Sequence, residues 1–287
     1  MPPVSVPQGL STDILAQPFE AKYQLSPYFK TMAFHSHDFY EIYMFLSGSV
    51  SYYIENAGYT LLPGDVLIIP PGSMHRPVNT DPNAVYERCY LWIGRDTLRS
   101  LQDADCPFIE ILETCAGTNN YLIHFEGDRL REFRGFFDNI ISLASTKDDA
   151  WNLACRSYLT LLFIRICQEI KSGHNITDLT HKNGTIPKVI VYINEHITED
   201  LSLDSLSEQF FISKYHLIRE FKKYTNSTLY AYILSKRIIL AKHLIQQGVP
   251  PTKACFASGF NNYSNFYKAF LAETGMTPKA FVATTLY

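Results

Sequence analysis

Histidine and carboxylate side chains in the first third of the chain are the residues best suited to chemistry. His35, His37 and Glu41 lie close together, and His75 follows a segment rich in glycine and proline that begins at Gly64. On an extended strand, side chains alternate between two faces, so His35 and His37 would point to the same side. A carboxylate combined with imidazoles suits iron, manganese, nickel or zinc. A metal or polar-ligand site is therefore a candidate function of this region.

Short strands separated by turn residues are predicted around these histidines, and the apolar and aromatic runs are 40–46, 49–54 and 66–69. Many short strands with no helical pattern between them favour an antiparallel barrel or sandwich. From Asp128 onward, apolar residues recur every three or four positions, and 153–170 forms a second, strongly apolar helix. We therefore expect a β domain over 1–127, followed by a helical pair over 128–171. The pair carries more apolar surface than one domain face needs, which predicts a homodimer joined there.

The remainder of the chain has a different composition and charge. Residues 172–185 are polar and aperiodic, as in a flexible linker, and 186–287 read as a succession of short helices. Residues 1–185 hold 14 Lys and Arg against 21 Asp and Glu, whereas residues 186–287 hold 11 against 7. Only the second part has the positive balance expected of a surface that approaches a polyanion.

One helical unit occurs twice within 186–287. In the first occurrence, Ser213 is a good N-cap for a helix in which Leu217 and Phe221 lie four residues apart on the buried face. In the second occurrence, Asn261 or Asn262 caps a helix with Phe266 and Phe270 facing inward. Between them, residues 229–245 form a longer helix bearing Arg237, long enough to hold two helix-turn-helix units about one DNA turn apart.

This last part of the chain resembles the DNA-binding domain of the AraC/XylS family of transcription regulators over Ile186 to Phe281. The resemblance is carried by Phe221-Lys222, Tyr232, Arg237, Ala241, Leu244, Gly259-Phe260, Ser264, Phe266, Phe270, Gly275 and Thr277-Pro278. It implies that the second helix of each unit enters a major groove. The base-contacting residues that it implies are Tyr215, Ile218 and Arg219 in the first unit and Tyr263, Ser264, Asn265, Tyr267 and Lys268 in the second.

The chemistry of these residues agrees with such a role. Arg219 can bridge guanine O6 and N7, and Asn265 can pair with adenine N6 and N7. The lysines Lys214, Lys222 and Lys223 are expected to contact phosphates, which position a protein on DNA and make its binding depend on salt.

The histidine region resembles the two cupin motifs. The first motif corresponds to His35-Ser-His37 with Glu41 and Gly48, and the second to Gly64, Pro70, Gly72, His75 and Asn79. In metal-dependent cupins these positions form a site of three histidines and one glutamate, which implies His35, His37, Glu41 and His75 as ligands. Regulators that resemble this chain also keep such residues in a metal-free sensory pocket, or use them only to close the barrel.

Aromatic side chains in the strands are candidates to line or fill the barrel. They are Tyr40, Tyr43, Phe45, Tyr52, Tyr53, Tyr90 and Trp92. We take Tyr43 and Trp92 with the four polar residues as the expected ligand-binding set. Aromatic faces suit the CH faces of a sugar, although such residues also serve as ordinary core.

Composition narrows the class of protein and its location. The 287 residues are 46% hydrophobic and 18% charged, which excludes disordered, collagen-like and coiled-coil chains. The six cysteines form no Cys-x-x-Cys pair and read as reduced core residues. With no secretory signal and no membrane span, we expect a cytoplasmic protein.

These observations predict an α+β protein of two domains. An antiparallel β cupin barrel with a C-terminal helical hairpin precedes an all-α domain with two helix-turn-helix units. The predicted function is a non-enzymatic transcription regulator that binds promoter DNA under control of a small-molecule effector and contacts RNA polymerase. A cupin metalloenzyme with an accessory helical domain is the alternative from another class, and a DNA-binding protein whose cupin senses nothing is a third. No cofactor is expected beyond a possible divalent metal in the cupin.

Overall fold

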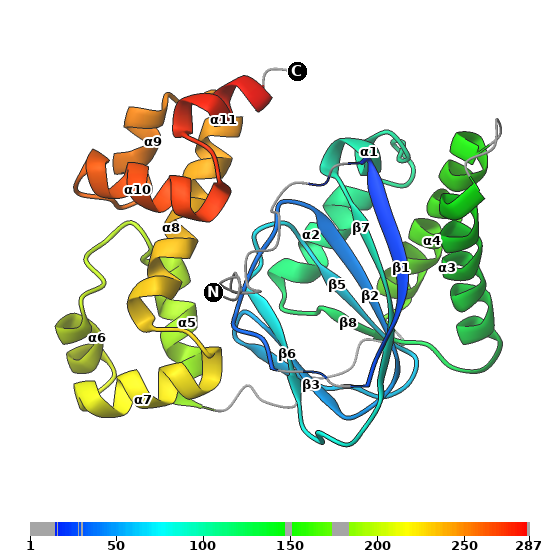
Figure 1. The fold of residues 1–287 in the computed structure, drawn as a ribbon, viewed down its shortest axis with the longest axis horizontal. Coiled ribbons are helices and arrows are strands. Elements are labelled where there is room, and N and C mark those ends of the chain that lie inside the picture. The colour runs from blue at the N-terminus through cyan, green and yellow to red at the C-terminus, as the bar shows by residue number, and fades with distance from the viewer. Residues whose placement is uncertain are drawn as a thin grey trace, which may run out of the picture. The chain divides into compact units, whose positions relative to one another are not determined.

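The computed structural model describes residues 15, 17–27, 29, 31–146, 151–173 and 184–285 (Figure 1). The chain forms two compact units, and a boundary between them in the sequence falls within the predicted linker. Of that linker, residues 174–183 lie outside the described part. The short segment Ala33–His35 groups with the C-terminal unit rather than with the strands on either side of it. In the described residues, no helix is long and apolar enough to cross a membrane.

The N-terminal unit contains two antiparallel sheets. Its strands are β1 (Phe19–Ser26), β2 (Tyr40–Ser47), β3 (Val50–Ile54), β4 (Ala57–Thr60), β5 (Asp65–Ile69), β6 (His75–Asn79), β7 (Tyr86–Ile93) and β8 (Leu122–His124). One sheet has the order β1-β7-β2-β5-β8 and the other the order β4-β3-β6. The predicted antiparallel β domain followed by helices is confirmed, although β1 and β8 were not among the predicted strands.

Strand β2 separates two hydrophobic cores. Ile42 and Met44 point to a core shared with the helices, whereas Tyr43 and Phe45 point to the core between the two sheets. This alternation corrects part of the aromatic prediction. Tyr40 has the even register of Ile42, so it lies in the helix-side core, where its hydroxyl donates to the Glu113 carboxylate at 2.9 Å.

The same alternation applies to strand β3. Tyr52 lies in the core between the sheets, and its neighbour Tyr53 is half-buried on the opposite face, where the Arg76 guanidinium lies 5.6 Å from its ring centroid. The prediction that Tyr53 lines the barrel is therefore wrong.

The described residues of the N-terminal unit also form the helices α1 (Arg95–Arg99), α2 (Phe108–Gly117), α3 (Gly127–Thr146) and α4 (Trp151–Ser172). The predicted helical pair corresponds to α3 and α4, whereas α1 and α2 were not predicted. Phe133 and Phe137 of α3 and Leu162 and Phe163 of α4 are fully buried in the core shared with the five-stranded sheet. These four side chains of the pair are thus used inside the unit.

From Thr185 onward, the described residues of the C-terminal unit form helices joined by turns and loops. The helices are α5 (Thr185–Glu195), α6 (Leu203–Gln209), α7 (Lys214–Thr225), α8 (Leu229–Gln246), α9 (Pro251–Ala257), α10 (Tyr263–Thr274) and α11 (Pro278–Thr285) (Figure 1). The two helix-turn-helix units are α6 with α7 and α9 with α10. As predicted, Ser213 caps α7 by accepting a hydrogen bond from the His216 amide, and Asn262 caps α10.

The turn between α6 and α7 contains a strained residue. Phe211 has a φ of 53°, in the left-handed region, and its side chain is 94% exposed. Such a backbone conformation costs about 1 to 2 kcal/mol in a residue other than glycine. An exposed ring has little packing to offset this cost.

Replacing Phe211 by glycine should therefore increase the free energy of unfolding by about 0.5 to 1 kcal/mol, since the strain removed exceeds the entropy that glycine adds to the unfolded chain. Urea unfolding followed by circular dichroism measures this change. The control is Asn226→Gly, at a φ of 54°, where the gain should be smaller because asparagine tolerates this region. A destabilised Phe211→Gly variant would contradict the argument.

Candidate functional site

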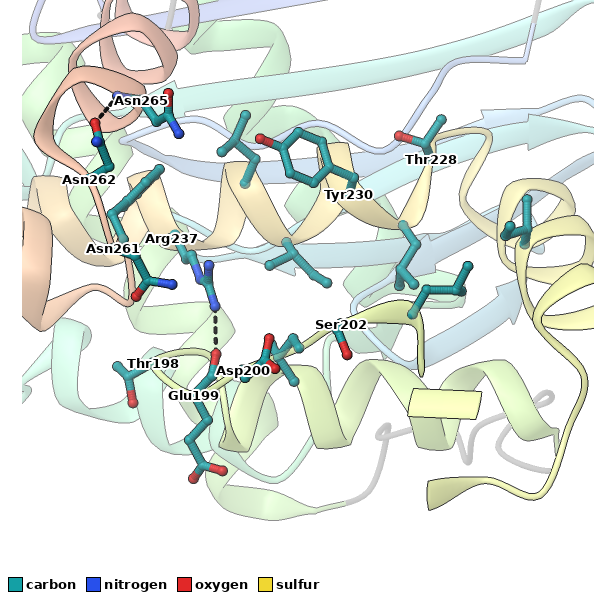
Figure 2. Close-up of a pocket in the computed structure, with 17 residues that line it drawn as sticks. Thr198, Glu199, Asp200, Ser202, Thr228, Tyr230, Arg237, Asn261, Asn262 and Asn265 are labelled. Atoms are coloured by element: carbon teal, nitrogen blue, oxygen red, sulfur yellow. Dashed lines mark hydrogen bonds between the residues drawn. The ribbon is translucent and has the colours of Figure 1, made fainter. Parts of the chain in front are cut away.

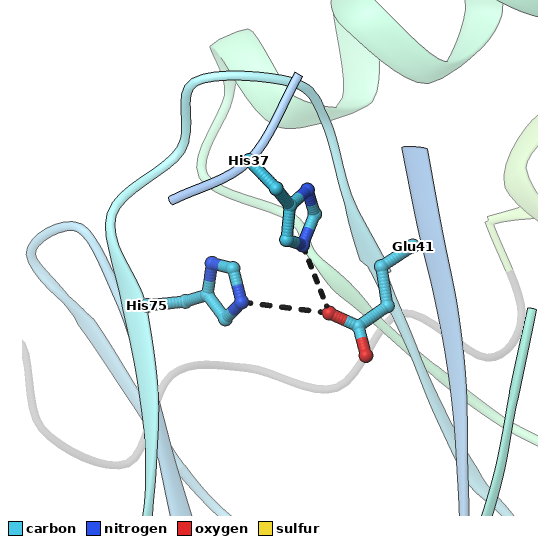
Figure 3. Close-up of side chains that lie close together, drawn as sticks. All are labelled: His37, Glu41 and His75. Atoms are coloured by element: carbon cyan, nitrogen blue, oxygen red, sulfur yellow. Dashed lines mark hydrogen bonds and ion pairs between the residues drawn. The ribbon is translucent and has the colours of Figure 1, made fainter. Parts of the chain in front are cut away.

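Three of the four predicted polar ligands converge inside the N-terminal unit. His37 precedes β2, Glu41 is the second residue of β2, and His75 begins β6 (Figure 3). Their donor atoms all lie within 4.8 Å of one another, and all three residues are buried. The Oε2 atom of Glu41 lies 3.1 Å from Nε2 of His37 and 3.4 Å from Nε2 of His75.

Backbone carbonyls orient both imidazoles. Nδ1 of His37 lies 2.9 Å from the carbonyl oxygen of Phe39, and Nδ1 of His75 lies 2.8 Å from that of Ser73. A carbonyl oxygen only accepts, so each Nδ1 carries the hydrogen and donates it. In a neutral imidazole this leaves the lone pair on Nε2, directed here toward the Glu41 carboxylate. Three electron-rich atoms thus meet, an arrangement that a shared cation stabilises.

Burial and mutual contacts set the protonation of this cluster. Burial is the main cause that lowers the pKa of His37, which favours its neutral form. Burial alone would raise the pKa of Glu41, but its interactions with His37 and His75 outweigh burial and hold that pKa below its ordinary value. A hydrogen bond from either Nε2 to the carboxylate needs a second proton on that ring, and a bound metal would take the place of this proton. A neutral imidazole at His37 and an ionised carboxylate at Glu41 are the forms in which these two groups bind a divalent metal.

His35 is not part of this cluster. Its Nδ1 donates to the carbonyl of Ala33 at 3.1 Å, and the segment Ala33–His35 groups with the other unit. The expectation that His35 and His37 share a strand face fails because β2 begins only at Tyr40, so the alternation of a strand does not apply to them. The structure brings together two histidines and one glutamate, not three and one.

Aromatic rings surround the cluster. Phe39 stacks on His37 with ring centroids 3.9 Å apart, and Trp92 packs on Phe39 at 5.2 Å. Trp92 is also the register partner of Glu41 in the β2–β7 pair. Its Nε1 is buried, and no residue of the described chain accepts a hydrogen bond from it.

Tyr43, the other aromatic residue of the predicted set, lies deeper between the sheets. Its hydroxyl is 2.5 Å from that of Tyr86, and its ring is 5.1 Å from that of Tyr52, which stacks on His75 at 6.2 Å. Tyr52 therefore connects Tyr43 to the cluster.

In the C-terminal unit, the predicted faces of α7 agree with the structure. Leu217 and Phe221 are fully buried, as predicted. The residues predicted to meet DNA are all exposed: Lys214, Tyr215, Ile218, Arg219, Lys222 and Lys223. Two contacts hold Arg219 at the surface. Its Nε lies 3.0 Å from the Glu220 carboxylate, and its guanidinium carbon lies 5.8 Å from the centroid of the Tyr215 ring. Lys214 forms an ion pair with Asp204 of α6.

Helix α10 shows the same division with one difference. Phe266 and Phe270 are fully buried, and the exposed residues among those predicted are Ser264, Asn265, Tyr267 and Lys268. Tyr263 is only half-buried and packs against Phe266 at 5.6 Å, so it contributes to the core as well as to the surface.

A hollow of about 680 Å³ lies between the two helix-turn-helix units (Figure 2). Ile218 of α7, Arg237 of α8 and Asn265 of α10 all line it. Tyr230 of α8 lines it too and is 72% exposed. Tyr230 was not predicted from the sequence, because nothing in the sequence distinguishes it from the buried Tyr232 two positions later.

Comparison with known proteins supplies independent evidence. Residues 206–284 match the family model of a helix-turn-helix domain, and residues 19–103 match the model of an AraC-like ligand binding domain. A Bacillus subtilis relative named uncharacterized HTH-type transcriptional regulator YbfI is 25% identical over 237 residues, 80% of each chain. The HTH-type transcriptional activator RhaS of Salmonella schwarzengrund is 22% identical over 248 residues, 85% of each chain.

Solved structures with some likeness include apo ToxT K231A from Vibrio cholerae, at 16% identity, which covers 93% of this chain and 97% of that one with a TM-score of 0.40. The DNA-binding domain of AdpA in complex with a target DNA has 20% identity, covers 36% of this chain and 93% of that one, and has a TM-score of 0.33.

The two matched models define a DNA-binding transcription regulator with a ligand-binding domain. Together with the relatives, these models support the assignment of the chain to the AraC/XylS family of transcription regulators. Because the related proteins are regulators, the prediction of a non-enzymatic protein is confirmed and the cupin metalloenzyme is not supported.

Proposed function

We propose that the chain binds a two-part promoter site by placing α7 and α10 in successive major grooves of the duplex. The observation that carries this proposal is the matched pair of capped helices, each with a buried apolar pair beneath and exposed polar side chains above. Helix α8 between the units has 18 residues, a length of about 27 Å, which is comparable to the 34 Å or so of one DNA turn.

Within this proposal, Tyr215, Ile218 and Arg219 read bases in the first groove. The base-contacting residues of α10 are Tyr263, Ser264, Asn265, Tyr267 and Lys268. Lys214, Lys222 and Lys223 bind phosphates, and Lys214 exchanges its Asp204 partner for one of them. Tyr230, exposed on α8 between the two reading helices, is added to the DNA-facing surface.

The effector site of the proposal is the cluster of His37, Glu41 and His75. These residues fit a divalent cation because two Nε2 lone pairs and a carboxylate oxygen face one another. A bound cation would supply a Lewis-acidic anchor for an oxygen atom of the effector. The buried Nε1–H of Trp92 lies on the same strand pair and offers a hydrogen bond to a second acceptor, which suits an oxygen-rich molecule such as a sugar.

We further propose that each predicted segment has its own role. Residues 1–127 sense the effector, 128–171 form the dimer, 172–185 are a linker and 186–287 bind DNA. The proposal places the protein in the cytoplasm and has it contact RNA polymerase, as the activators among its relatives suggest. Leu153 and Leu161 support dimerisation through α4, because they are 74% and 47% exposed and lie eight residues apart on one helix face.

Replacing Arg219 by alanine should weaken binding to the preferred site by about 1 to 3 kcal/mol, because a bidentate contact to guanine is lost. Electrophoretic retardation of the DNA upstream of the gene, and of a scrambled duplex, measures this change. Lys222→Ala is the control, since it should weaken both duplexes about equally and reduce the salt dependence by about one ion. Equal affinity of Arg219→Ala and the parent for the preferred site would refute the reading role.

Purified protein without an affinity tag should bind about one equivalent of Zn²⁺, Ni²⁺ or Mn²⁺ through the cluster. Isothermal titration calorimetry should show that His75→Ala abolishes this binding and that His35→Ala leaves it intact. Metal binding to the folded state should also raise the melting temperature of the parent. Loss of binding in His35→Ala, or none in the parent, contradicts the three-residue site.

The double substitution of Leu153 and Leu161 by glutamate should convert a dimer to a monomer in sedimentation velocity, because it places charges in an apolar interface. Asn139→Glu, on the exposed face of α3, is the matched control and should stay dimeric. A parent protein that is monomeric at micromolar concentration and on DNA would remove dimerisation from the proposal.

A further inference from the structure

Arg237 occupies the middle of α8 and binds the loop that leads into the first helix-turn-helix unit. Its Nε donates to the carbonyl of Ile197 at 3.0 Å, and its Nη2 donates to the carbonyl of Glu199 at 2.6 Å (Figure 2). Both carbonyls belong to the loop between α5 and α6. The guanidinium fork therefore ties this loop to the centre of the connecting helix.

Gly259, in the turn between α9 and α10 of the second unit, meets the same loop. A Cβ atom at this position would lie 2.7 Å from the Ile197 carbonyl oxygen and 2.9 Å from Nε of Arg237. Its φ of 89° is also one that side chains with a Cβ rarely adopt. Only glycine allows this approach, so one carbonyl, that of Ile197, touches both α8 and the second unit.

Arg237 lies between two parts of α8 that pack against different units. On the N-terminal side, Tyr232 packs edge-on against Phe221 of the first unit, with centroids 5.4 Å apart. On the C-terminal side, Ile238 and Ala241 belong to the core that contains Phe266 of the second unit. Arg237 stands at the boundary, where a rotation of one unit against the other would have to occur.

We propose that Arg237 and Gly259 hold the two reading helices at a set separation and orientation, and so determine which spacing of the two half-sites on DNA is bound tightly. This inference rests on the proposed function, since it requires that both α7 and α10 read DNA. Arg237 is a positioning residue in this role. Its guanidinium is committed to two carbonyl oxygens rather than directed to the duplex.

The test measures affinity against half-site spacing with the full-length protein. The preferred site is first selected from random duplexes with the parent, and the half-sites are then moved apart or together by one base pair. One base pair shifts a half-site by about 3.4 Å and about a tenth of a turn, so the parent should lose at least about tenfold in affinity. Arg237→Lys lacks the planar fork that spans the two carbonyls. For this variant and for Gly259→Ala, the same change of spacing should reduce affinity by less than about threefold.

Two controls separate positioning from folding. Lys236→Ala, the adjacent cation on α8, should keep the parental dependence on spacing. Both test variants should bind a duplex with a single half-site as the parent does, at low salt where such binding is measurable. Circular dichroism confirms that each variant is folded, and either test variant alone suffices for the decision.

The inference is overturned if the folded variants keep the parental loss on spacing changes, or if they lose single half-site binding by the same factor as binding to the full site. Different results are expected if the proposed function itself is wrong. In that case the parent would select no DNA sequence, or a substitution in α10 such as Asn265→Ala would leave its preferred sequence unchanged.

Discussion

Burial of two apolar pairs, Leu217 with Phe221 and Phe266 with Phe270, is the constraint on which the DNA-binding surface depends. Each pair is fully buried and spaced four residues apart, so it determines the rotation of its helix about the helix axis. Once that rotation is set, the side chains between the buried positions have to face outward. The polar faces of α7 and α10 are in this sense a consequence of the core beneath them.

In the β domain the corresponding constraint is the alternation of side chains along β2. Even-numbered residues such as Ile42 pack against the helices, whereas odd-numbered residues face the space between the sheets. Glu41 has an odd position and pairs in register with Trp92, which brings the carboxylate and the indole to one site. The packing of β2 thus places Glu41, one of the three residues of the cluster, between the two sheets.

Much of this arrangement was predictable from sequence, and the exceptions have physical causes. Helix faces were predicted correctly because a spacing of three and four positions is a local property, as Leu217 and Phe266 show. The prediction for His35 was wrong because it assumed a strand where regular pairing has not yet begun. Tyr53 was misplaced because two adjacent aromatic residues cannot share a strand face. The contact of Gly259 with the Ile197 carbonyl joins residues about sixty positions apart, and no local pattern encodes it.

The hydrogen bonds that orient His37 and His75 have a consequence for how this regulator can diversify. Both Nδ1 atoms donate to main-chain oxygens, at Phe39 and Ser73, rather than to side chains. Main-chain acceptors persist whatever amino acid occupies those positions, so the tautomer of each imidazole does not depend on its neighbours' identity. Side chains around the cluster can therefore change in evolution while both Nε2 atoms keep their direction.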